Sequence, residues 1–335
     1  MIEEAFWSDV CNRYGLGSLT ERPQSVTGGL LHRMYRLSTS QGYFAVKVLN
    51  PDIMKKPKVR NEYRRSEHIA STVAEAGIPA ITAIAVEGDT VQDFGASSVM
   101  LYPWVEGKML SPNPASADQA RQIGTILGRM HALDLQIPGL PTPEFHIYPD
   151  AHWATLVQQA EAASTMWTHD PESLLADLYA WNRLARQGYD DVESHWVVSH
   201  GDLDQKNVLW QHDNTPWLVD WESVGLTHPA LEAVGAALNW SGQTVEPPLK
   251  AAFTALLEGY RTQAELASDV GYAALQGCLG NWLHWLEPNM RRSLPDGSAD
   301  PQEKMLAARE VVQTLTLLRS LASNLSTWAE WCGRF

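Results

Sequence analysis

The stretch VVSHGDLDQKNVLWQHDNTPWLVDWE, residues 197–222, decides which fold the rest of the sequence must fit. It contains Asp202, Asn207 and Asp220, each flanked by short apolar runs that are typical of buried strands. Polar and charged groups near a core are costly unless a partner neutralises or uses them. Two interpretations follow: these residues serve turns and caps, or they converge on a cation.

A hairpin inside this stretch would bring two of the three side chains together. The runs VLW and PWLVD flank the turn QHDNTP, and their pairing as antiparallel strands would place Asn207 near Asp220. An amide oxygen and a carboxylate are hard ligands, of the kind that Mg²⁺ takes together with phosphates and water. Asp202, near the same edge, would then accept a hydrogen bond from a substrate hydroxyl.

The ordered set resembles the protein-kinase-like superfamily, and specifically the aminoglycoside phosphotransferase and choline kinase family. HGDL, NVL and VDWE follow the pattern of an H-x-D-x-x-x-x-N catalytic loop and a metal-binding aspartate, with DWE in the place of D-F-G. The resemblance implies an α+β, bilobal fold with a small antiparallel-sheet N-lobe and a large, mainly helical C-lobe. It also implies Asp202 as the catalytic base, and Asn207 and Asp220 as ligands of Mg²⁺.

Motifs nearer the N-terminus fit the same resemblance. In SVTGGLLH, Gly28 and Gly29 have no Cβ, so their backbone can approach phosphates and offer N–H donors. FAVKVL places Lys47 between two valines, and by resemblance this lysine contacts the α- and β-phosphates and pairs with a helix glutamate. Glu62 and Glu67 are the two candidates, and the spacing to the GIP that follows favours Glu67.

Two further segments resemble parts of the family. VMLYPWVEG, residues 99–107, resembles the hinge that binds adenine, through the carbonyl of Pro103 and the N–H of Val105. Proline at this place loses only a donor that the adenine contact does not need. LGRMHALD resembles the helix in which a histidine is structural, so we expect His131 to be a satisfied core residue.

The resemblance runs from about residue 25 to residue 235 and contains one departure. Where relatives often have G-D-P-x-x-D-L-A, this chain has LTHPALEAVG, with His228 and Glu232 at the two acidic positions. The chain therefore lacks the negative charge at the first of these positions. This weakens its assignment to any one subfamily but does not affect the residues needed for phosphoryl transfer.

Periodicity indicates a smaller α+β lobe followed by a larger, mainly helical one. The resemblance implies that these are an N-terminal nucleotide-binding lobe at 1–106 and a C-terminal catalytic and substrate-binding lobe at 107–335. The first is predicted to contain a hairpin at 32–50, a helix at 58–77 and two apolar runs around the turn EGDT. The second is predicted to be mainly helical, with helical patterns at 117–136, 150–190 and 229–335.

Composition narrows the class of partner and the compartment. The chain has 335 residues and a formal charge of −14, which argues against nucleic acid and is compatible with a cationic small molecule or simply with solubility. Cys11, Cys278 and Cys332 are scattered, as in a reducing compartment. Without an apolar h-region at the start or a run of eighteen apolar residues, the sequence predicts a cytoplasmic protein and no membrane partner.

The predicted reaction is transfer of the γ-phosphoryl group of ATP, with GTP as the alternative donor, to a hydroxyl of a small molecule in the presence of Mg²⁺. Acidic residues favour an aminoglycoside antibiotic, and they include Asp204, Glu222, Glu232 and Glu287. Tryptophans in ALNWSG and GNWLHWLEP favour a quaternary ammonium such as choline, or a macrolide. Ethanolamine, homoserine and sugars are further alternatives.

The sequence supports two hypotheses from outside the class of small-molecule kinases less well. A nucleotide-binding module without activity has no need of the base Asp202. A protein kinase would carry an activation segment ending in A-P-E after Asp220, and the sequence has none.

Overall fold

The computed structural model of the chain describes residues 3–26, 32–110, 115–145, 147–192, 195–243, 248–267, 270–295 and 300–333. The chain divides into two compact units. The first comprises Met1–Leu110 and His200–Val224, and the second comprises Ser111–Ser199 and Gly225–Phe335. The segment of Asp202, Asn207 and Asp220 therefore folds with the N-terminal unit. The domain limits at 106 and 107 stay a prediction.

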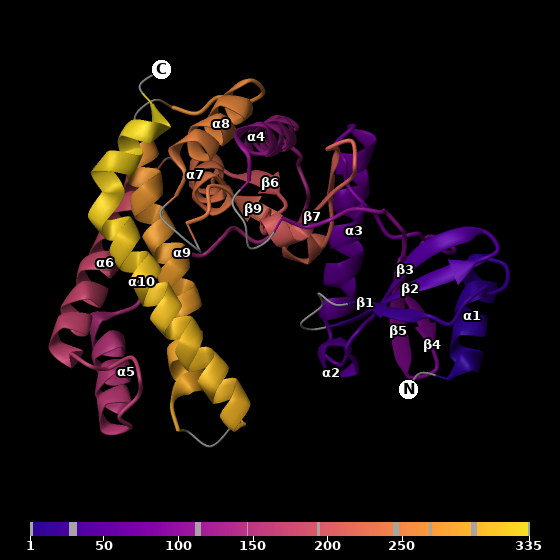
Figure 1. Cartoon of the computed structure of the whole chain (residues 1–335), viewed down its shortest axis with the longest axis horizontal. Helices are drawn as coiled ribbons and strands as arrows, with labels where there is room; N and C mark the ends of the chain where they lie inside the picture. Colours follow the sequence, from indigo (N-terminus) through magenta and orange to yellow (C-terminus); the bar gives the residue numbers. More distant parts are fainter. Residues whose placement is uncertain are drawn as a thin grey trace. The chain divides into compact units, whose positions relative to one another are not determined.

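The first unit is built on a five-stranded antiparallel sheet with the strand order β1-β2-β3-β5-β4 (Figure 1). Its strands are β1 (Gln24–Val26), β2 (Arg33–Thr39), β3 (Gly42–Val48), β4 (Gln92–Phe94) and β5 (Ser97–Pro103). β2 and β3 pair from Arg33↔Val48 to Thr39↔Gly42, which confirms the hairpin predicted at 32–50. The α+β class and its antiparallel N-terminal sheet are thus confirmed.

The two faces of this sheet are covered by different helices. Alternation along β3 sends Val46 and Val48 into a core with Trp7 and Val10 of α1 (Glu4–Tyr14). The opposite face carries Met100, which packs with Tyr63 of α3 (Val59–Glu75). Because Lys47 lies directly opposite Met100 in the β3–β5 register, its side chain projects from the α3 face.

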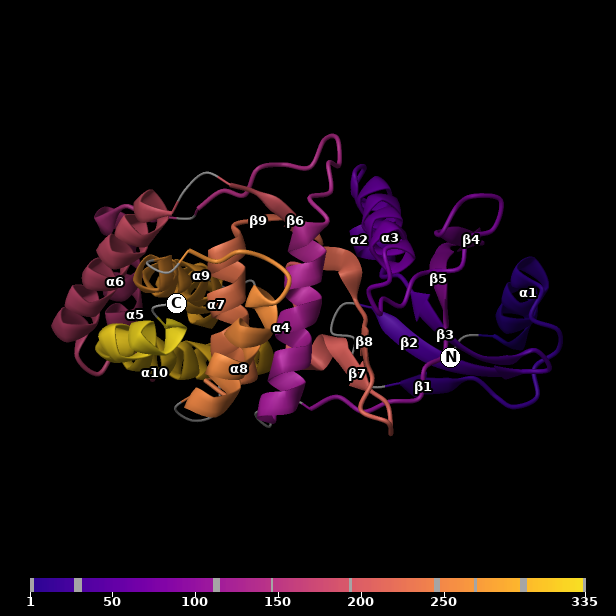
Figure 2. The ribbon, with the colours of Figure 1, turned by 90° about the horizontal axis from the view of Figure 1, so that it is seen from above.

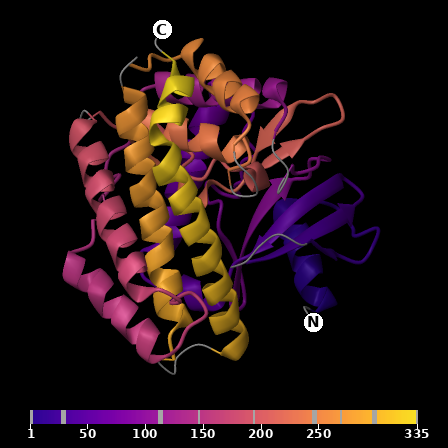
Figure 3. The same ribbon diagram turned by 60° about the vertical axis from the view of Figure 1, so that its left-hand side comes forward.

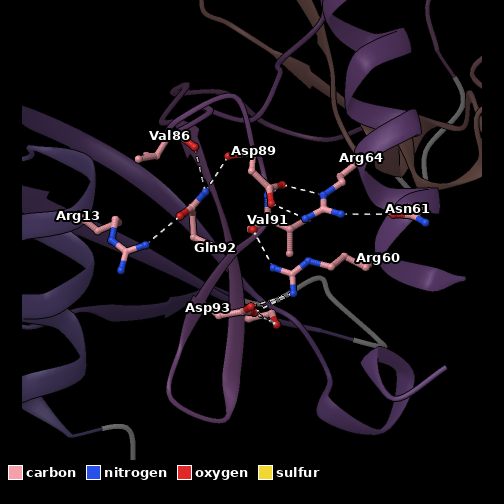
Figure 4. Close-up of polar contacts among 10 residues, drawn as sticks. Arg13, Arg60, Asn61, Arg64, Val86, Asp89, Val91, Gln92 and Asp93 are labelled. Atoms are coloured by element: carbon pink, nitrogen blue, oxygen red, sulfur yellow. Dashed lines mark hydrogen bonds and ion pairs between the residues drawn. The ribbon is translucent and has the colours of Figure 1, made fainter. Parts of the chain in front are cut away.

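Polar contacts fasten α1 and α3 to the segment around β4 (Figure 4). Arg60 of α3 donates to both oxygens of Asp93, at 3.0 and 2.9 Å, and Arg64 donates from Nε to Asp89 at 2.9 Å. Arg13 of α1 donates to Gln92 at 3.2 Å. The contacts of Arg60 and Arg64 hold α3 beside the sheet. This helix was predicted at 58–77 and is confirmed at Val59–Glu75. A short helix, α2 (Pro51–Met54), precedes it.

The segment His200–Val224 adds a small hairpin to the first unit. It contains η1 (Gln205–Asn207), β7 (Val208–Trp210), β8 (Pro216–Leu218) and η2 (Trp221–Ser223). β7 and β8 pair antiparallel, which confirms the predicted hairpin. Single bridges join it to the earlier chain, at Ala80↔Leu218 and Lys108↔Trp210. The apolar run 80–86 forms such isolated bridges rather than a strand of the sheet.

The second unit is mainly helical, as predicted. Its described elements are α4 (Ala117–Ala132), α5 (Asp150–Ala162), α6 (Pro171–Asp191), β6 (Val197–Ser199), β9 (Gly225–Thr227), α7 (Pro229–Trp240), α8 (Lys250–Arg261), α9 (Val270–Ser293) and α10 (Pro301–Cys332). α4 lies beside α8, and the long helices α9 and α10 run side by side (Figures 2 and 3). α4 ends four residues before its predicted limit, and Asp134 just beyond it has φ 43°.

Glycines allow α4 and α8 to approach closely. A Cβ at Gly124 would collide with the carbonyl oxygen of Leu256, and one at Gly259 would collide with that of Arg121. Both positions therefore require a residue without a side chain, since neither backbone can move without unpacking the pair.

His131 of α4 is a buried residue with partners, as predicted. Its Nδ1 lies 2.9 Å from the hydroxyl of Tyr260, and its Nε2 lies 3.3 Å from Glu232. Glu232 also accepts a hydrogen bond from Ser199 at 2.8 Å. These four residues are called the His131 cluster below.

Candidate active site

Lys47 is the buried cation of the first unit. Only 8% of this residue is exposed, because the strand directs it onto the face covered by α3. Its Nζ donates to Oδ1 of Asp220 at 2.9 Å and is also paired with Oε1 of Glu222. Burial alone would lower the pKa of Lys47, but the two carboxylates outweigh burial and raise it above its ordinary value. The lysine is therefore held in its charged form.

Asp202 and Asn207 are joined through the turn that η1 makes. Nδ2 of Asn207 donates to the carbonyl of Asp202 at 2.8 Å and to its Oδ2 at 2.9 Å. Because a carbonyl and a carboxylate can only accept, these contacts fix which end of the amide is nitrogen. Oδ1 is then the atom of Asn207 that can ligate a metal ion. Lys206 lies 3.1 Å from the same Oδ2 of Asp202.

The β7–β8 hairpin brings Asp220 to Asn207, as the sequence predicted. The N–H of Val219 donates to the carbonyl of Asn207 at 3.0 Å, one residue before Asp220. Nε2 of His200 lies 3.0 Å from the carbonyl oxygen of Val219 and so also holds the backbone next to Asp220. Asp220 itself has φ 64° and ψ 67°, a left-handed conformation that turns its side chain out of the strand direction. Its side chain is 48% exposed.

Glu67 is the buried helix glutamate, whereas Glu62 is exposed. Glu67 accepts hydrogen bonds from the N–H of Ala83 at 2.7 Å and from the hydroxyl of Tyr102 at 2.8 Å. Burial raises the pKa of Glu67, although these bonds and the nearby Lys47 lower it in part. Among the described residues, no ion pair joins Glu67 to Lys47, so the predicted pair is replaced by those of Lys47 with Asp220 and Glu222.

The expected adenine-binding residues lie at the end of β5. Trp104 donates its N–H to Tyr43, so Tyr43 and Trp104 form a hydrogen-bonded pair and the adjacent Phe44–Pro103 pair does not. The carbonyl of Pro103 therefore points away from β3, on the edge where Leu101 accepts from Ile84 at 2.7 Å. Val105 follows outside any helix or strand and is partly buried. Gly28 and Gly29 lie outside the described residues.

The donor set fits a magnesium–nucleotide group. Oδ1 of Asn207 and the half-exposed carboxylate of Asp220 are two hard oxygen ligands beside a buried ammonium. Mg²⁺ commonly takes one or two protein oxygens and completes its shell with phosphates and water. In keeping with so open a shell, the described part of the chain contains no group of three or more His, Cys, Asp or Glu that would hold a metal by itself.

Two residues of this site have roles that the sequence did not predict. Glu222, predicted to be a substrate-binding acid, is paired with Lys47, and His32 lies 3.4 Å from Glu222. Burial would raise the pKa of Glu222, but hydrogen bonds from His32 and Lys47 bring it to about 2. The position of Glu222 two residues after Asp220 was the available signal, whereas nothing in the sequence singled out His32.

The other acids considered for substrate binding also have protein partners. Asp204 caps η1, and Glu232 belongs to the His131 cluster. Glu287 is 2.9 Å from His152 and 2.6 Å from Arg291. Each of these three carboxylates therefore has at least one partner within the protein.

The two tryptophan segments differ in exposure. Trp240 is fully buried and belongs to the core of the second unit. Trp285 of α9 is 49% exposed and can offer a ring to a ligand.

A cavity of about 920 Å³ lies within the second unit, and none of the predicted catalytic, nucleotide-binding or metal-binding residues lines it. It is lined by Val197, where β6 begins, and by residues of α4, α7, α8 and α9. None of the residues that bind Lys47 contributes to it.

The sequence matches the model of the phosphotransferase enzyme family over residues 23–266. None of the curated proteins compared with it matched significantly. A spectinomycin phosphotransferase solved with ADP and spectinomycin has a TM-score of 0.70 at 12% identity, over 96% of this chain and 99% of that one. An amicoumacin kinase solved with AMP-PNP, Ca²⁺ and its antibiotic has a TM-score of 0.64 at 12% identity, over 94% of this chain and 93% of that one. A choline kinase from Cryptosporidium parvum has a TM-score of 0.55 at 12% identity, over 98% of this chain and 99% of that one.

At these identities the structural likeness establishes the fold, which is the protein-kinase-like one expected. Among the described residues, no helix is both long and apolar enough to cross a membrane.

Proposed function

The chain belongs to the phosphotransferase enzyme family, and we propose that it transfers the γ-phosphoryl group of ATP to a hydroxyl group of a small molecule. The observation that carries this proposal is the convergence of Lys47, Asp220, Asn207 and Asp202 in one compact unit, although 173 residues separate Lys47 from Asp220 in the sequence. An isolated polar turn would not account for the buried ammonium that Asp220 holds at 2.9 Å.

Each residue has a defined task in this reaction. Lys47 binds the inner phosphates through its third N–H, since Asp220 and Glu222 take two of the three. Asn207 and Asp220 would hold Mg²⁺, which when bound neutralises charge on the phosphate oxygens. The Asn207 amide donates to the Asp202 carboxylate and so restricts its orientation. Asp202 then orients the acceptor hydroxyl and takes its proton.

The nucleotide base would be held by the backbone at the end of β5. The carbonyl of Pro103, directed away from β3, is suited to accept from the adenine amino group, and the N–H of Val105 to donate to the ring. Gly28 and Gly29 would cover the phosphates. Backbone recognition of this kind discriminates ATP from GTP through the exocyclic group, which makes GTP the alternative donor to test.

For the acceptor we propose an antibiotic of the aminoglycoside kind, in line with the antibiotics bound by two of the similar structures. The net charge of −14 would draw an amine-rich molecule toward the protein. A metabolic alcohol such as choline is the second candidate, and the exposed ring of Trp285 is the observation that favours it. We further propose that the protein acts in the cytoplasm.

The test is ATP turnover in the presence of Mg²⁺ against a panel of acceptors. The panel contains aminoglycosides, spectinomycin, macrolides, choline, ethanolamine, homoserine and sugars. We expect stimulation by one class and a phosphorylated product of that class by mass spectrometry. Nucleotide binding without stimulation by any acceptor would instead favour a binding module, and the same panel with GTP would define the donor.

A further inference from the structure

The partner of Lys47 in this chain comes from the segment after β8 and not from α3. Both oxygens of Glu67 are engaged elsewhere, Oε2 with the N–H of Ala83 and Oε1 with the hydroxyl of Tyr102. The carboxylate of Glu67 thus ties α3 to β5 and to the chain between them. Glu222 supplies the second carboxylate on the Lys47 ammonium.

Glu222 is in turn anchored by His32, which directly precedes β2. His32 is 6% exposed, and its Nε2 lies 3.4 Å from Oε1 of Glu222 and 2.7 Å from the hydroxyl of Tyr63. The N–H of Asn50 donates to its Nδ1 at 3.0 Å. A nitrogen that accepts a backbone N–H carries no proton, so the proton of this imidazole is on Nε2. The N–H of His32 is therefore directed at Tyr63 and Glu222.

We propose that His32 is a positioning residue that acts through Glu222 to hold the Lys47 ammonium for the nucleotide phosphates. Glu222 thereby performs the orienting task that sequence analysis assigned to Glu67. This inference rests on the proposed function in one respect, that Lys47 binds a nucleotide.

The physical reason is the freedom of the lysine side chain. Four rotatable bonds let an ammonium leave a single carboxylate at little cost, whereas two carboxylates restrict it to one geometry. Glu222 can serve in this way only if its own position is fixed. A buried imidazole with a fixed tautomer provides that fixation, because its Nε2 N–H is hydrogen-bonded to Tyr63 at 2.7 Å and lies 3.4 Å from the charged Oε1 of Glu222.

Two substitutions of His32 separate its two nitrogens. His32→Asn keeps an acceptor near the place of Nδ1 but is too short to reach Glu222. His32→Gln keeps an amide donor near the place of Nε2 and can still reach Glu222. We expect His32→Asn to raise the Kd of a fluorescent ATP analogue with Mg²⁺, and the KM for ATP, about tenfold, with kcat changed less. His32→Gln should stay within about threefold of the wild type.

A double-mutant cycle tests whether His32 acts through Glu222. In a Glu222→Gln background, His32→Asn should weaken nucleotide binding little further, because the residue through which it acts is already altered. In a Glu67→Gln background the two effects should multiply. Thermal unfolding of every variant identifies those that have lost the fold, and the exposed His68→Ala is the control for an unrelated histidine on α3.

Three outcomes would refute the inference: an unchanged Kd in His32→Asn, multiplicative effects of His32→Asn and Glu222→Gln, or a wild-type chain that binds no nucleotide. Equal losses of affinity in His32→Asn and His32→Gln that follow their melting temperatures would also refute it, since they would indicate a merely structural histidine. A chain that binds nucleotide with the expected cycle but phosphorylates no acceptor would overturn the proposed function alone.

Discussion

Two buried polar networks, one in each unit, show how differently the chain uses charge. The Lys47 cluster, formed by His32, Lys47, Tyr63, Asp220 and Glu222, leaves its carboxylates partly open, with Asp220 48% and Glu222 27% exposed. It joins segments that are far apart in the sequence.

The His131 cluster is closed by comparison. The side chain of His131 is 2% exposed and that of Glu232 is 12% exposed, and Ser199 is fully buried. Each of its groups is used by another group of the same unit. The exposure of the carboxylates therefore distinguishes the two networks, although both would look alike in the sequence as buried charges.

The comparison leads to a simple expectation for mutations. Substitutions in and beside the Lys47 cluster should reduce activity with little change in stability, and substitutions around the His131 cluster should do the reverse. The largest effect is expected at the base, and the smallest at a surface ion pair.

Asp202→Ala should lower turnover by a factor of about 10² to 10⁴, because the acceptor hydroxyl loses its base and its orientation. Nucleotide binding should remain largely intact, since Asp202 is not assigned to the metal or the phosphates. Steady-state kcat and the Kd of an ATP analogue measure the two effects. Asp213→Asn, in the turn of the same hairpin, is the matched control and should leave turnover within about twofold. Undiminished turnover in Asp202→Ala would remove this residue from catalysis.

Gly124→Ala should destabilise the second unit by about 3 kcal/mol, since a Cβ there collides with the Leu256 carbonyl between α4 and α8. Gly235→Ala on α7 is the matched control, because its Cβ would lie 3.7 Å from Sγ of Cys278, an ordinary contact. Chemical denaturation of both variants measures the difference. Equal stability of the two would mean that the helix pair is not packed through its glycines.

Tyr260→Phe should cost about 1 kcal/mol, by removing the hydroxyl that contacts His131 at 2.9 Å. Turnover per folded molecule should stay at the wild-type value, because no residue of the His131 cluster is assigned to the nucleotide, the metal or the acceptor. Denaturation midpoints and kcat give the two readings. A loss of kcat in a fully folded Tyr260→Phe would break the proposed division between the two networks.

Asp89→Asn should reduce stability by less than about 1 kcal/mol, as for other partly exposed ion pairs. The hydrogen bond from Arg64 holds the pKa of Asp89 below its ordinary value of 3.8. A carboxyl whose pKa falls on folding stabilises the protein above the unfolded pKa, and that contribution is lost as the pH falls further. The difference between wild type and Asp89→Asn should therefore shrink between pH 5 and pH 3, roughly around that ordinary pKa. A difference that is constant with pH would contradict the ion pair drawn in Figure 4.

The elements that local sequence determines were predictable. The β2–β3 hairpin, α3 and the β7–β8 hairpin follow from alternation, helical spacing and turn residues, and all three are confirmed. The approach of Asn207 to Asp220 also followed, because a short hairpin leaves few registers.

The partner of Lys47 was not predictable in the same way. Glu67 and Glu222 have the same side chain, and only the packing of Tyr102 and Ala83 decides that Glu67 is used elsewhere. His32 carried no local signal, because its contacts with Asn50 and Glu222 depend on tertiary folding. Motifs thus predicted the residues of the candidate site, whereas the pairing among them depended on distant residues.

The assembly of the first unit from two stretches has a consequence during synthesis. Residues 1–110 lack the bridge partners of Ala80 and Lys108, which arrive with Leu218 and Trp210 about a hundred residues later. During synthesis, α4, α5 and α6 therefore emerge from the ribosome before the N-terminal sheet can pair with the segment that completes its unit. A fragment that stops at residue 110 would leave Lys47 without either of its carboxylates, as a buried and unpaired charge.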